Sequence, residues 1–185
     1  ARLISSIRTV AAFAYRKSCG KKLIFPNSEL SYSNNFLNMM FAEDEKVQLI
    51  DKDIEKALDA LLIIHADHEQ NCSTSTVRLV GSSKVNLYSS ICAGICALWG
   101  PLHGGANQQV IEMLDRIYTQ GVSVKECINM AKDRESSFKL MGFGHRVYKT
   151  YDPRAKLIKG TFENLMKKKN INDPLFDIAM ELEER

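Results

Sequence analysis

Apolar residues recur along most of the chain at the spacing of three and four residues that is typical of amphipathic helices. In residues 2–18 this stripe ends at Cys19-Gly20, and glycine is a common helix stop. Residues 51–66 show the same spacing behind Asp51, a suitable N-cap. In residues 108–118 the aligned apolar positions are Val110, Ile111, Leu114 and Ile117. Each of these segments predicts a helix that buries one face.

Other segments have recognisable helix starts. The hydroxyls of residues 73–76 can cap a helix, Ser123 and Glu126 match a capping box, and Pro153 stands where a first helical turn admits proline. Residues 87–99 are rich in small apolar side chains, which predicts a buried central helix. No segments pair convincingly as strands. We predict an all-α fold of eight to nine helices, over residues 2–18, 33–41, 51–66, 73–80, 87–99, 108–118, 124–134 and 153–169 and from 174 onward.

The charge balance excludes a strongly basic nucleic-acid-binding protein. The 185 residues are 45% hydrophobic, enough for one substantial core, and 25 Lys and Arg against 22 Asp and Glu give a formal charge of +3. Residues 167–169 form the only dense basic run. A solvated helix face is the favoured interpretation of that run, ahead of an anion contact.

The cysteines indicate a reducing compartment. There are five, an odd number, and they lack the close spacing of a secreted disulfide framework. Cys92 and Cys96 are four apart, so they share a helix face as small packing residues. No apolar run approaches the roughly 18 residues of a transmembrane helix, and no signal peptide is evident. We therefore expect a soluble protein without a membrane partner.

All four histidines lie in three short polar or glycine-rich runs. These runs are residues 65–71, 100–107 and 142–149. Histidine is the side chain whose unperturbed pKa lies nearest neutral pH. Its confinement to turn-like segments between apolar helices therefore favours a chemical role.

The first run ends a predicted helix. His65 and His68 are three apart, so they share a face and can bind a metal together with a carboxylate. The H-E-x-x-H signature is absent, so we predict no metal site. His68 is better interpreted as an anion-binding side chain in a cleft, and His65 as a helix-end capping residue.

The second run places His103 among glycines just before a helix. Such a turn leaves backbone amides free and lets a ligand approach closely. The helix dipole favours a neutral imidazole, which can donate a hydrogen bond to a carbonyl. The alternative is a tight glycine turn in which the histidine is incidental.

The third run begins like a dinucleotide fingerprint. Val147 occupies the position of the third glycine and no strand precedes it, so nicotinamide binding is a weak interpretation. His145 is followed by the cations Arg146, Lys149 and Arg154. These suggest a substrate with carboxylate or phosphate groups, although Arg154 can equally be an exposed first-turn residue.

Together the three runs resemble citrate synthases, particularly the bacterial type. The similarity includes residues 73–78 and 151–154 and extends from about Ser33 to Arg185. It implies a multi-helical fold whose large and small domains close over substrate, with residues 1–120 in the large domain and 121–185 in the small domain. It also implies a homodimer, or a higher assembly, that condenses acetyl-CoA, oxaloacetate and water to citrate and CoA, the entry step of the tricarboxylic acid cycle.

The resemblance also implies roles for individual residues. His103 would stabilise the enol of acetyl-CoA, and His145 would polarise the oxaloacetate ketone, while His68 and Arg154 would bind oxaloacetate. CoA contacts are implied for Leu102, Met141, Gly142, Phe143 and Gly144, and supporting roles for Asn71 and Ser73.

The resemblance further implies acetyl-CoA as co-substrate and no permanently bound cofactor. It places the aspartate that removes the methyl proton beyond the last residue. We therefore expect both ends to be truncated and this polypeptide alone to be inactive. Residues 74–77 and Trp99 favour citrate over 2-methylcitrate synthesis, and a noncatalytic helical binding module is a further alternative. The expected compartment is the cytoplasm, or the mitochondrial matrix or another organelle in a eukaryote.

Overall fold

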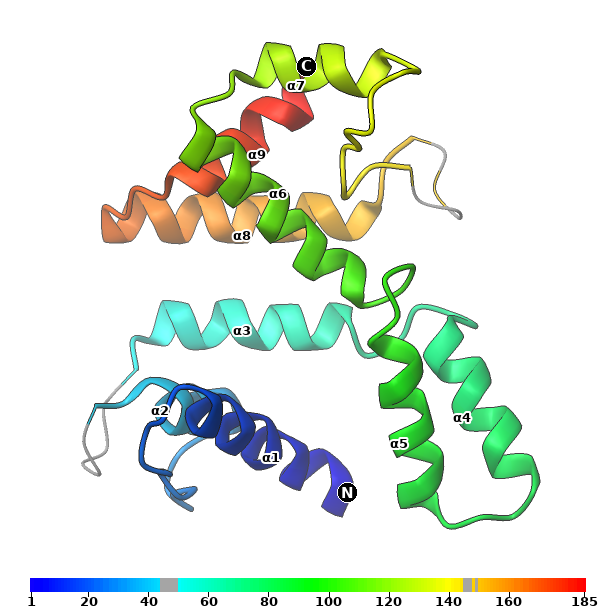
Figure 1. Cartoon of the computed structure of the whole chain (residues 1–185). Helices are drawn as coiled ribbons and strands as arrows, with labels where there is room; N and C mark the ends of the chain where they lie inside the picture. The colour runs from blue at the N-terminus through cyan, green and yellow to red at the C-terminus, as the bar shows by residue number, and fades with distance from the viewer. Residues whose placement is uncertain (44–49, 145–147, 149) are drawn as a thin grey trace. The chain divides into compact units, whose positions relative to one another are not determined.

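A computed structural model describes residues 1–43, 50–144, 148 and 150–185. Within those ranges the chain forms α-helices and no strand, which confirms the predicted all-α class (Figure 1). None of the described helices is both long and apolar enough to cross a membrane. The helices of the described part are α1 (Arg2–Ser18), α2 (Tyr32–Phe41), α3 (Lys52–Ile64), α4 (Cys72–Ser82), α5 (Leu87–Leu98), α6 (Gly105–Gln120), α7 (Val124–Lys132), α8 (Pro153–Lys169) and α9 (Pro174–Glu184).

Most helix boundaries follow the predicted local signals. The Asp51 carboxylate caps α3 by accepting a hydrogen bond from the Asp53 amide. Ser123 and Glu126 form both hydrogen bonds of a capping box at the start of α7. Gly20 follows α1 in the left-handed region, with φ of 66°. These boundaries therefore arise from side-chain and backbone chemistry within a few residues.

The predicted cap of α4 is wrong. The Asn71 side chain accepts the hydrogen bond from the Thr74 amide at 2.9 Å, so the cap lies before the hydroxyl run of residues 73–76. The helix consequently begins at Cys72. This assignment leaves the Ser73 side chain available for contacts outside its own helix.

The chain packs into two compact units. The first unit comprises residues 1–67 and 154–169 and therefore holds α1, α2, α3 and α8. The second comprises residues 68–153 and 170–185 and holds α4, α5, α6, α7 and α9. The large-domain and small-domain boundary expected near residue 120 is a separate division and stays a prediction.

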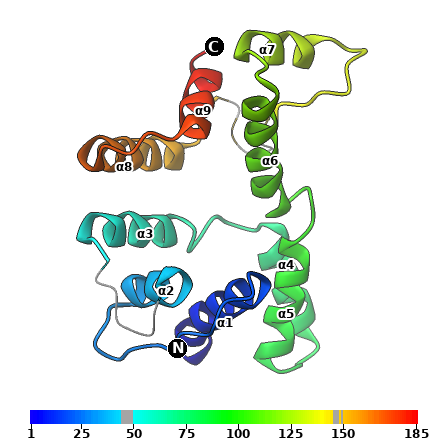
Figure 2. The same ribbon diagram turned by 60° about the vertical axis from the view of Figure 1, so that its left-hand side comes forward.

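The first unit is organised around a buried arginine. α1 and α2 lie side by side in Figures 1 and 2, and Arg16 of α1 is only 2% exposed. Its guanidinium donates hydrogen bonds to the carbonyls of Met40 and Ala42 at 3.1 and 2.9 Å, and to that of Lys22. The Met40 and Ala42 carbonyls lie at the end of α2, where carbonyls lack a partner within the helix, so the cation satisfies them in place of water.

The core of the second unit lies among α6, α7 and α9. Its buried residues are Met113, Leu114, Ile117, Val124, Cys127 and Leu182. The predicted stripe on α6 is wrong at one position, because Ile111 is 58% exposed and Met113 faces the core. Burial raises the pKa of the Cys127 thiol, which accords with a packing role.

α4 and α5 pack closely against each other in the second unit (Figure 2). A Cβ added to Gly94 would lie 2.6 Å from Cγ2 of Val77, so the small residue permits this approach. The prediction that α5 is a buried central helix is wrong for this chain. Only Ser90 and Gly94 of α5 are buried, because its other side carries apolar residues that no described segment covers.

Candidate active site

His103 lies in a tight turn between α5 and α6. The amides of His103 and Gly105 both donate to the Gly100 carbonyl, at 3.0 and 3.1 Å, and the Ala106 amide donates to the His103 carbonyl. The predicted turn before a helix is therefore confirmed. The prediction that the backbone amides are free is wrong at these three positions, because each amide donates a hydrogen bond to a carbonyl of the turn. The start of α6 therefore presents these amides to its own backbone rather than to an anion.

Gly104 lets this turn approach the end of α5. A Cβ at Gly104 would lie 2.6 Å from the Leu98 carbonyl oxygen and 2.5 Å from Cδ1 of the same residue. The backbone φ of −63° is ordinary, so the requirement for glycine is steric. The contact fixes the residue next to His103 against a helix.

The imidazole of His103 is held by Ser73 in the first turn of α4. Two atoms of Ser73 contact His103 Nε2: the hydroxyl oxygen Oγ lies 2.8 Å away and the backbone amide nitrogen 3.3 Å away. Ser73 Oγ also lies 3.0 Å from the carbonyl oxygen of Gly94 on α5. Ser73 thus links the His103 ring to α4 directly and to the Gly94 carbonyl of α5 through its hydroxyl.

These contacts define the tautomer of His103. A backbone amide can only donate, so Nε2 is the acceptor and the ring proton resides on Nδ1. The Ser73 hydroxyl carries one proton and the Gly94 carbonyl can only accept, so in this tautomer the hydroxyl donates either to Nε2 at 2.8 Å or to that carbonyl at 3.0 Å. The ring is therefore oriented with Nδ1–H as its remaining hydrogen-bond donor.

His68 contacts the third histidine-containing run. Its Nε2 lies 2.9 Å from the hydroxyl oxygen of Tyr148, and the two ring centroids are 5.6 Å apart. Sequence reasoning missed Tyr148. Its position within residues 142–149 was the available signal. The contact brings together two runs that are 80 residues apart in the chain.

The loop of residues 141–144 packs against α6. The Met141 amide contacts Sδ of Met113 at 3.3 Å, and a Cβ at Gly142 would lie 3.1 Å from Cγ2 of Val110. Gly142 and Gly144 have φ values of 92° and 80°. Such values favour glycine, so both glycines are required by the path of the loop.

Of the predicted CoA contacts, Met141 and Gly142 pack against α6, and Leu102 lies in the turn that precedes it. Leu102 stands three residues before the first residue of this helix and is 92% exposed. Phe143, in the loop against Val110 and Met113, is 53% exposed. Eight residues of helix, about 12 Å, separate the start of α6 from Met113. Leu102 and Phe143 are thus two exposed apolar side chains, one in the turn before α6 and one in the loop whose Met141 and Gly142 contact α6.

His65 has the predicted helix-end role. It is the C-cap residue of α3, and its Nδ1 lies 2.7 Å from the Leu61 carbonyl oxygen. The Leu61 carbonyl also accepts the His65 amide at 3.3 Å, so the ring places a second donor on the same carbonyl at the end of the helix. Among the residues that the structure describes, no three His, Cys, Asp or Glu side chains gather in a group that could hold a metal ion.

The whole chain, residues 1–185, matches the family model for the citrate synthase C-terminal domain. The chain belongs to the citrate synthase family. Citrate synthase 1 of Mycobacterium tuberculosis is 52% identical over 183 residues, which cover 99% of this chain and 42% of that protein. The chain thus spans less than half the length of the curated relatives it matches.

Solved citrate synthases have the same fold. The enzyme from Pyrobaculum aerophilum is 40% identical and superposes with a TM-score of 0.84 over 98% of this chain and 43% of its own. The enzyme from Thermoplasma acidophilum was solved as a ternary complex with carboxymethyl coenzyme A and oxaloacetate. It is 35% identical, with a TM-score of 0.83 over 98% of this chain and 46% of its own.

The roles that the resemblance implies for His145 and Arg154 are not tested by the described structure. His145, Arg146 and Lys149 lie outside the described residues. Arg154 is in the first turn of α8 and belongs to the first unit, whereas His68 and His103 belong to the second. The site roles of His145 and Arg154 therefore stay predictions.

Proposed function

We propose that the complete protein condenses acetyl-CoA with oxaloacetate and water to form citrate and CoA. The observation that carries this proposal is the His103 ring, whose Nε2 is occupied by Ser73 so that Nδ1–H remains as the donor. A match to citrate synthases over the whole chain supports the substrate pair. The activity belongs to the complete protein, with this chain supplying part of the site.

In the proposed reaction, His103 Nδ1 donates a hydrogen bond to the thioester oxygen of acetyl-CoA. A base, which the resemblance assigns to an aspartate outside this chain, removes a methyl proton. The negative charge that develops on the thioester oxygen strengthens the bond to Nδ1, so the histidine stabilises the enol form. A donor aimed at such an oxygen contributes about 10² to 10³ in rate.

The enol carbon then forms a bond to the ketone carbon of oxaloacetate. The ketone oxygen takes up a proton, the step for which we propose His145, and the product is citryl-CoA. Water hydrolyses the thioester and releases CoA as the thiol. We propose that His68 and Arg154 bind the oxaloacetate oxygens, with Tyr148 orienting His68 through the 2.9 Å contact.

We propose that Leu102 and the 141–144 loop contact CoA. The apolar side chains of Leu102 and Phe143 are exposed, so adenine or the pantetheine arm can pack on them. Asn71 supports the site by capping α4, the helix that carries Ser73. Acetyl-CoA is a co-substrate in this scheme, and no permanently bound cofactor is needed for it.

The substrate requirement tests this proposal. Thiol release by the protein expressed from its complete coding sequence should require acetyl-CoA and oxaloacetate together. Replacing acetyl-CoA by propionyl-CoA should lower kcat/KM at least tenfold, because one methylene in a hydrophobic pocket discriminates by about 10- to 200-fold. Faster turnover of propionyl-CoA would favour 2-methylcitrate synthesis. Absence of thiol release with either thioester would favour a noncatalytic binding module.

We further propose that the protein is a homodimer. α4 and α5 expose large apolar side chains, and a stable monomer rarely exposes such residues together. They are Leu79, Leu87, Tyr88, Ile95 and Leu98. A second copy packed on this pair of helices would cover the face that no described segment covers. The sedimentation measurement described next also detects any assembly larger than the dimer.

Sedimentation velocity of the complete protein measures this assembly. The wild-type protein should sediment as a dimer or a multiple of it, and Ile95→Glu should shift it toward the monomer because a buried unpaired carboxylate is costly. Lys84→Glu, in the exposed turn between α4 and α5, is the matched control and should leave the dimer intact. A wild-type protein that sediments as a monomer would contradict the proposal.

The cysteines support a reducing compartment such as the cytoplasm. All five are free in the structure, and four are exposed. Exposed thiols persist where cellular reductants maintain them. The proposed reaction is the step by which two carbon atoms enter the tricarboxylic acid cycle.

The proposed division into a large and a small domain near residue 120 would allow the two domains to close over both substrates.

A further inference from the structure

The basic run at the end of α8 contacts the start of α3. Lys168 Nζ lies 2.5 Å from a carboxylate oxygen of Asp53, and Lys169 forms an ion pair with Asp51. The sequence favoured a solvated face for this run. Lys167 and Lys168 are exposed, as predicted, and Lys169 is half-buried. Lys168 and Lys169 also pair with the carboxylates that begin another helix.

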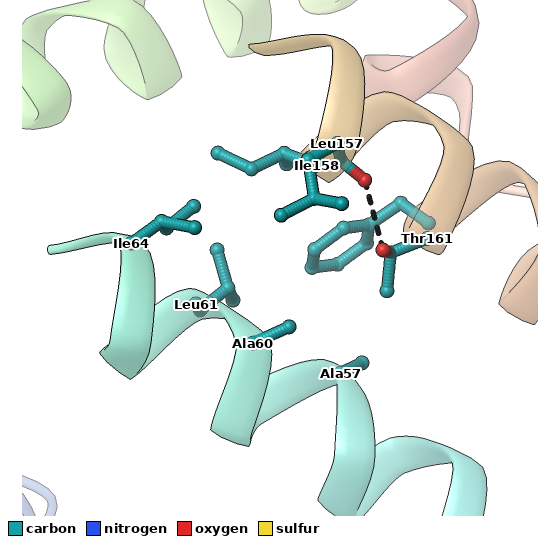
Figure 3. Close-up of a pocket in the computed structure, with 8 residues that line it drawn as sticks. Ala57, Ala60, Leu61, Ile64, Leu157, Ile158 and Thr161 are labelled. Carbon is teal, nitrogen blue, oxygen red and sulfur yellow. Dashed lines mark hydrogen bonds between the residues drawn. The ribbon is translucent and has the colours of Figure 1, made fainter. Parts of the chain in front are cut away.

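The rest of the contact between α3 and α8 is apolar. Figure 3 shows the side chains of the two helices facing each other across a narrow seam. Ile64 near the end of α3 and Leu157 near the start of α8 line the same seam, so the helices run antiparallel. The remaining lining residues are Ala57, Ala60, Leu61, Ile158, Thr161 and Phe162. Apolar burial is non-directional, whereas the ion pairs join defined residues at one end of the seam and so favour one register.

Both ion pairs also agree with the helix dipoles. Asp51 and Asp53 stand at the positive end of α3, and Lys168 and Lys169 stand at the negative end of α8. The hydrogen bond from Lys169 lowers the pKa of the Asp51 carboxyl, and the hydrogen bond to Asp53 raises the pKa of Lys168. The Lys168 side chain is 65% exposed, so dissolved salt should weaken its pair.

The opposite end of α8 carries Arg154. Fifteen residues of helix, about 22 Å, separate it from Lys169. The chain enters the first unit at Arg154 and leaves it after Lys169, so α8 is the segment that returns from the second unit to pack on α3. Because a helix of this length moves as a rod, a contact at one end restricts where the other end lies.

We propose that Lys168 and Lys169 are positioning residues for oxaloacetate binding: by pairing with Asp53 and Asp51 they set the register of α8 on α3 and thereby the position of Arg154. The proposal rests on the proposed function. The two lysines touch no substrate. Their loss alters binding through α8, and so it selectively raises the KM for oxaloacetate.

The test compares Lys168→Gln/Lys169→Gln with the wild type, each expressed from the complete coding sequence. The double variant should raise the KM for oxaloacetate about three- to tenfold and leave the KM for acetyl-CoA and kcat within about twofold. Lys168→Arg/Lys169→Arg should restore the wild-type values, since it keeps both charges. Lys167→Gln is the matched control, because Lys167 is exposed on the same turn and takes part in neither pair.

A double-mutant cycle between Asp51 and Lys169 tests whether these two residues act as a pair. Asp51→Asn keeps a good helix cap but removes the charge, so it should raise the oxaloacetate KM as Lys169→Gln does, and the two together should add little more. Hydrogen exchange at the end of α8 should be faster in the Gln variants. An unchanged oxaloacetate KM in the double Gln variant, with normal citrate formation, would overturn the positioning role alone. Absence of citrate formation by the wild type would overturn the proposed function and the positioning role with it.

Discussion

Replacing His103 with alanine in the protein expressed from its complete coding sequence should lower kcat for citrate formation by about 10² to 10³, while oxaloacetate still binds. Alanine removes the Nδ1–H donor that the contacts with Ser73 leave available. The loss is expected in kcat because the hydrogen bond strengthens only as charge develops on the thioester oxygen. Steady-state thiol release measures kcat, and calorimetric titration with oxaloacetate measures binding.

Two comparisons make this result specific. Ser73→Ala removes the hydroxyl but keeps the backbone amide that contacts Nε2, so its loss in kcat should be clearly smaller than that of His103→Ala. His65→Ala removes a histidine that only caps α3 and should change kcat less than twofold. Equal activity of His103→Ala and wild type would exclude the proposed role of His103.

Replacing Gly104 with alanine should also impair catalysis, although alanine is the smallest change available. The added Cβ would lie 2.6 Å from the Leu98 carbonyl oxygen, and a backbone atom cannot move away as a flexible side chain can. The turn must shift by a few tenths of an ångström or more, and His103 shifts with it. We expect kcat to fall at least tenfold, and the overpacking to cost about 1 to 3 kcal/mol of folding free energy.

Gly160→Ala is the matched control for this substitution. Gly160 lies within α8, and a Cβ there would meet no atom within 4 Å. Alanine should stabilise the helix by about 1 kcal/mol and leave kcat unchanged. Thermal unfolding and thiol release measure the two effects on both variants. A Gly104→Ala protein that matches Gly160→Ala in both would show that the turn tolerates a side chain.

The helices were predictable because their signals are local. Asp51, Ser123 and Glu126 cap their helices through bonds spanning two or three residues, and Gly20 ends α1 by its own conformation. The start of α4 was misplaced since asparagine and the hydroxyl residues after it have similar capping ability. In the structure Asn71 is the cap, and Ser73 instead contacts His103 and the Gly94 carbonyl.

The site was only partly predictable because its contacts are distant in sequence. The glycine-rich turn indicated His103 as a candidate site residue. Its glycines, however, allow close backbone packing, and its amides form hydrogen bonds within the turn rather than to a ligand. The resemblance named Ser73, whereas nothing in the spacing of residues placed it 2.8 Å from a ring 30 residues away. Tyr148 and the lysines of α8 were missed for the same reason, since their partners are 80 and more than 100 residues distant.

The most direct test of the account is enolisation of acetyl-CoA without condensation. Malate, an analogue of oxaloacetate whose ketone is replaced by an alcohol, fills the oxaloacetate site but offers no electrophile. In deuterium oxide, mass spectrometry of acetyl-CoA then reports methyl proton exchange alone. We predict that the wild type and His145→Ala incorporate deuterium and that His103→Ala does so at least 10² times more slowly. Exchange by His103→Ala at the wild-type rate would contradict the assignment of His103 as the residue that stabilises the enol.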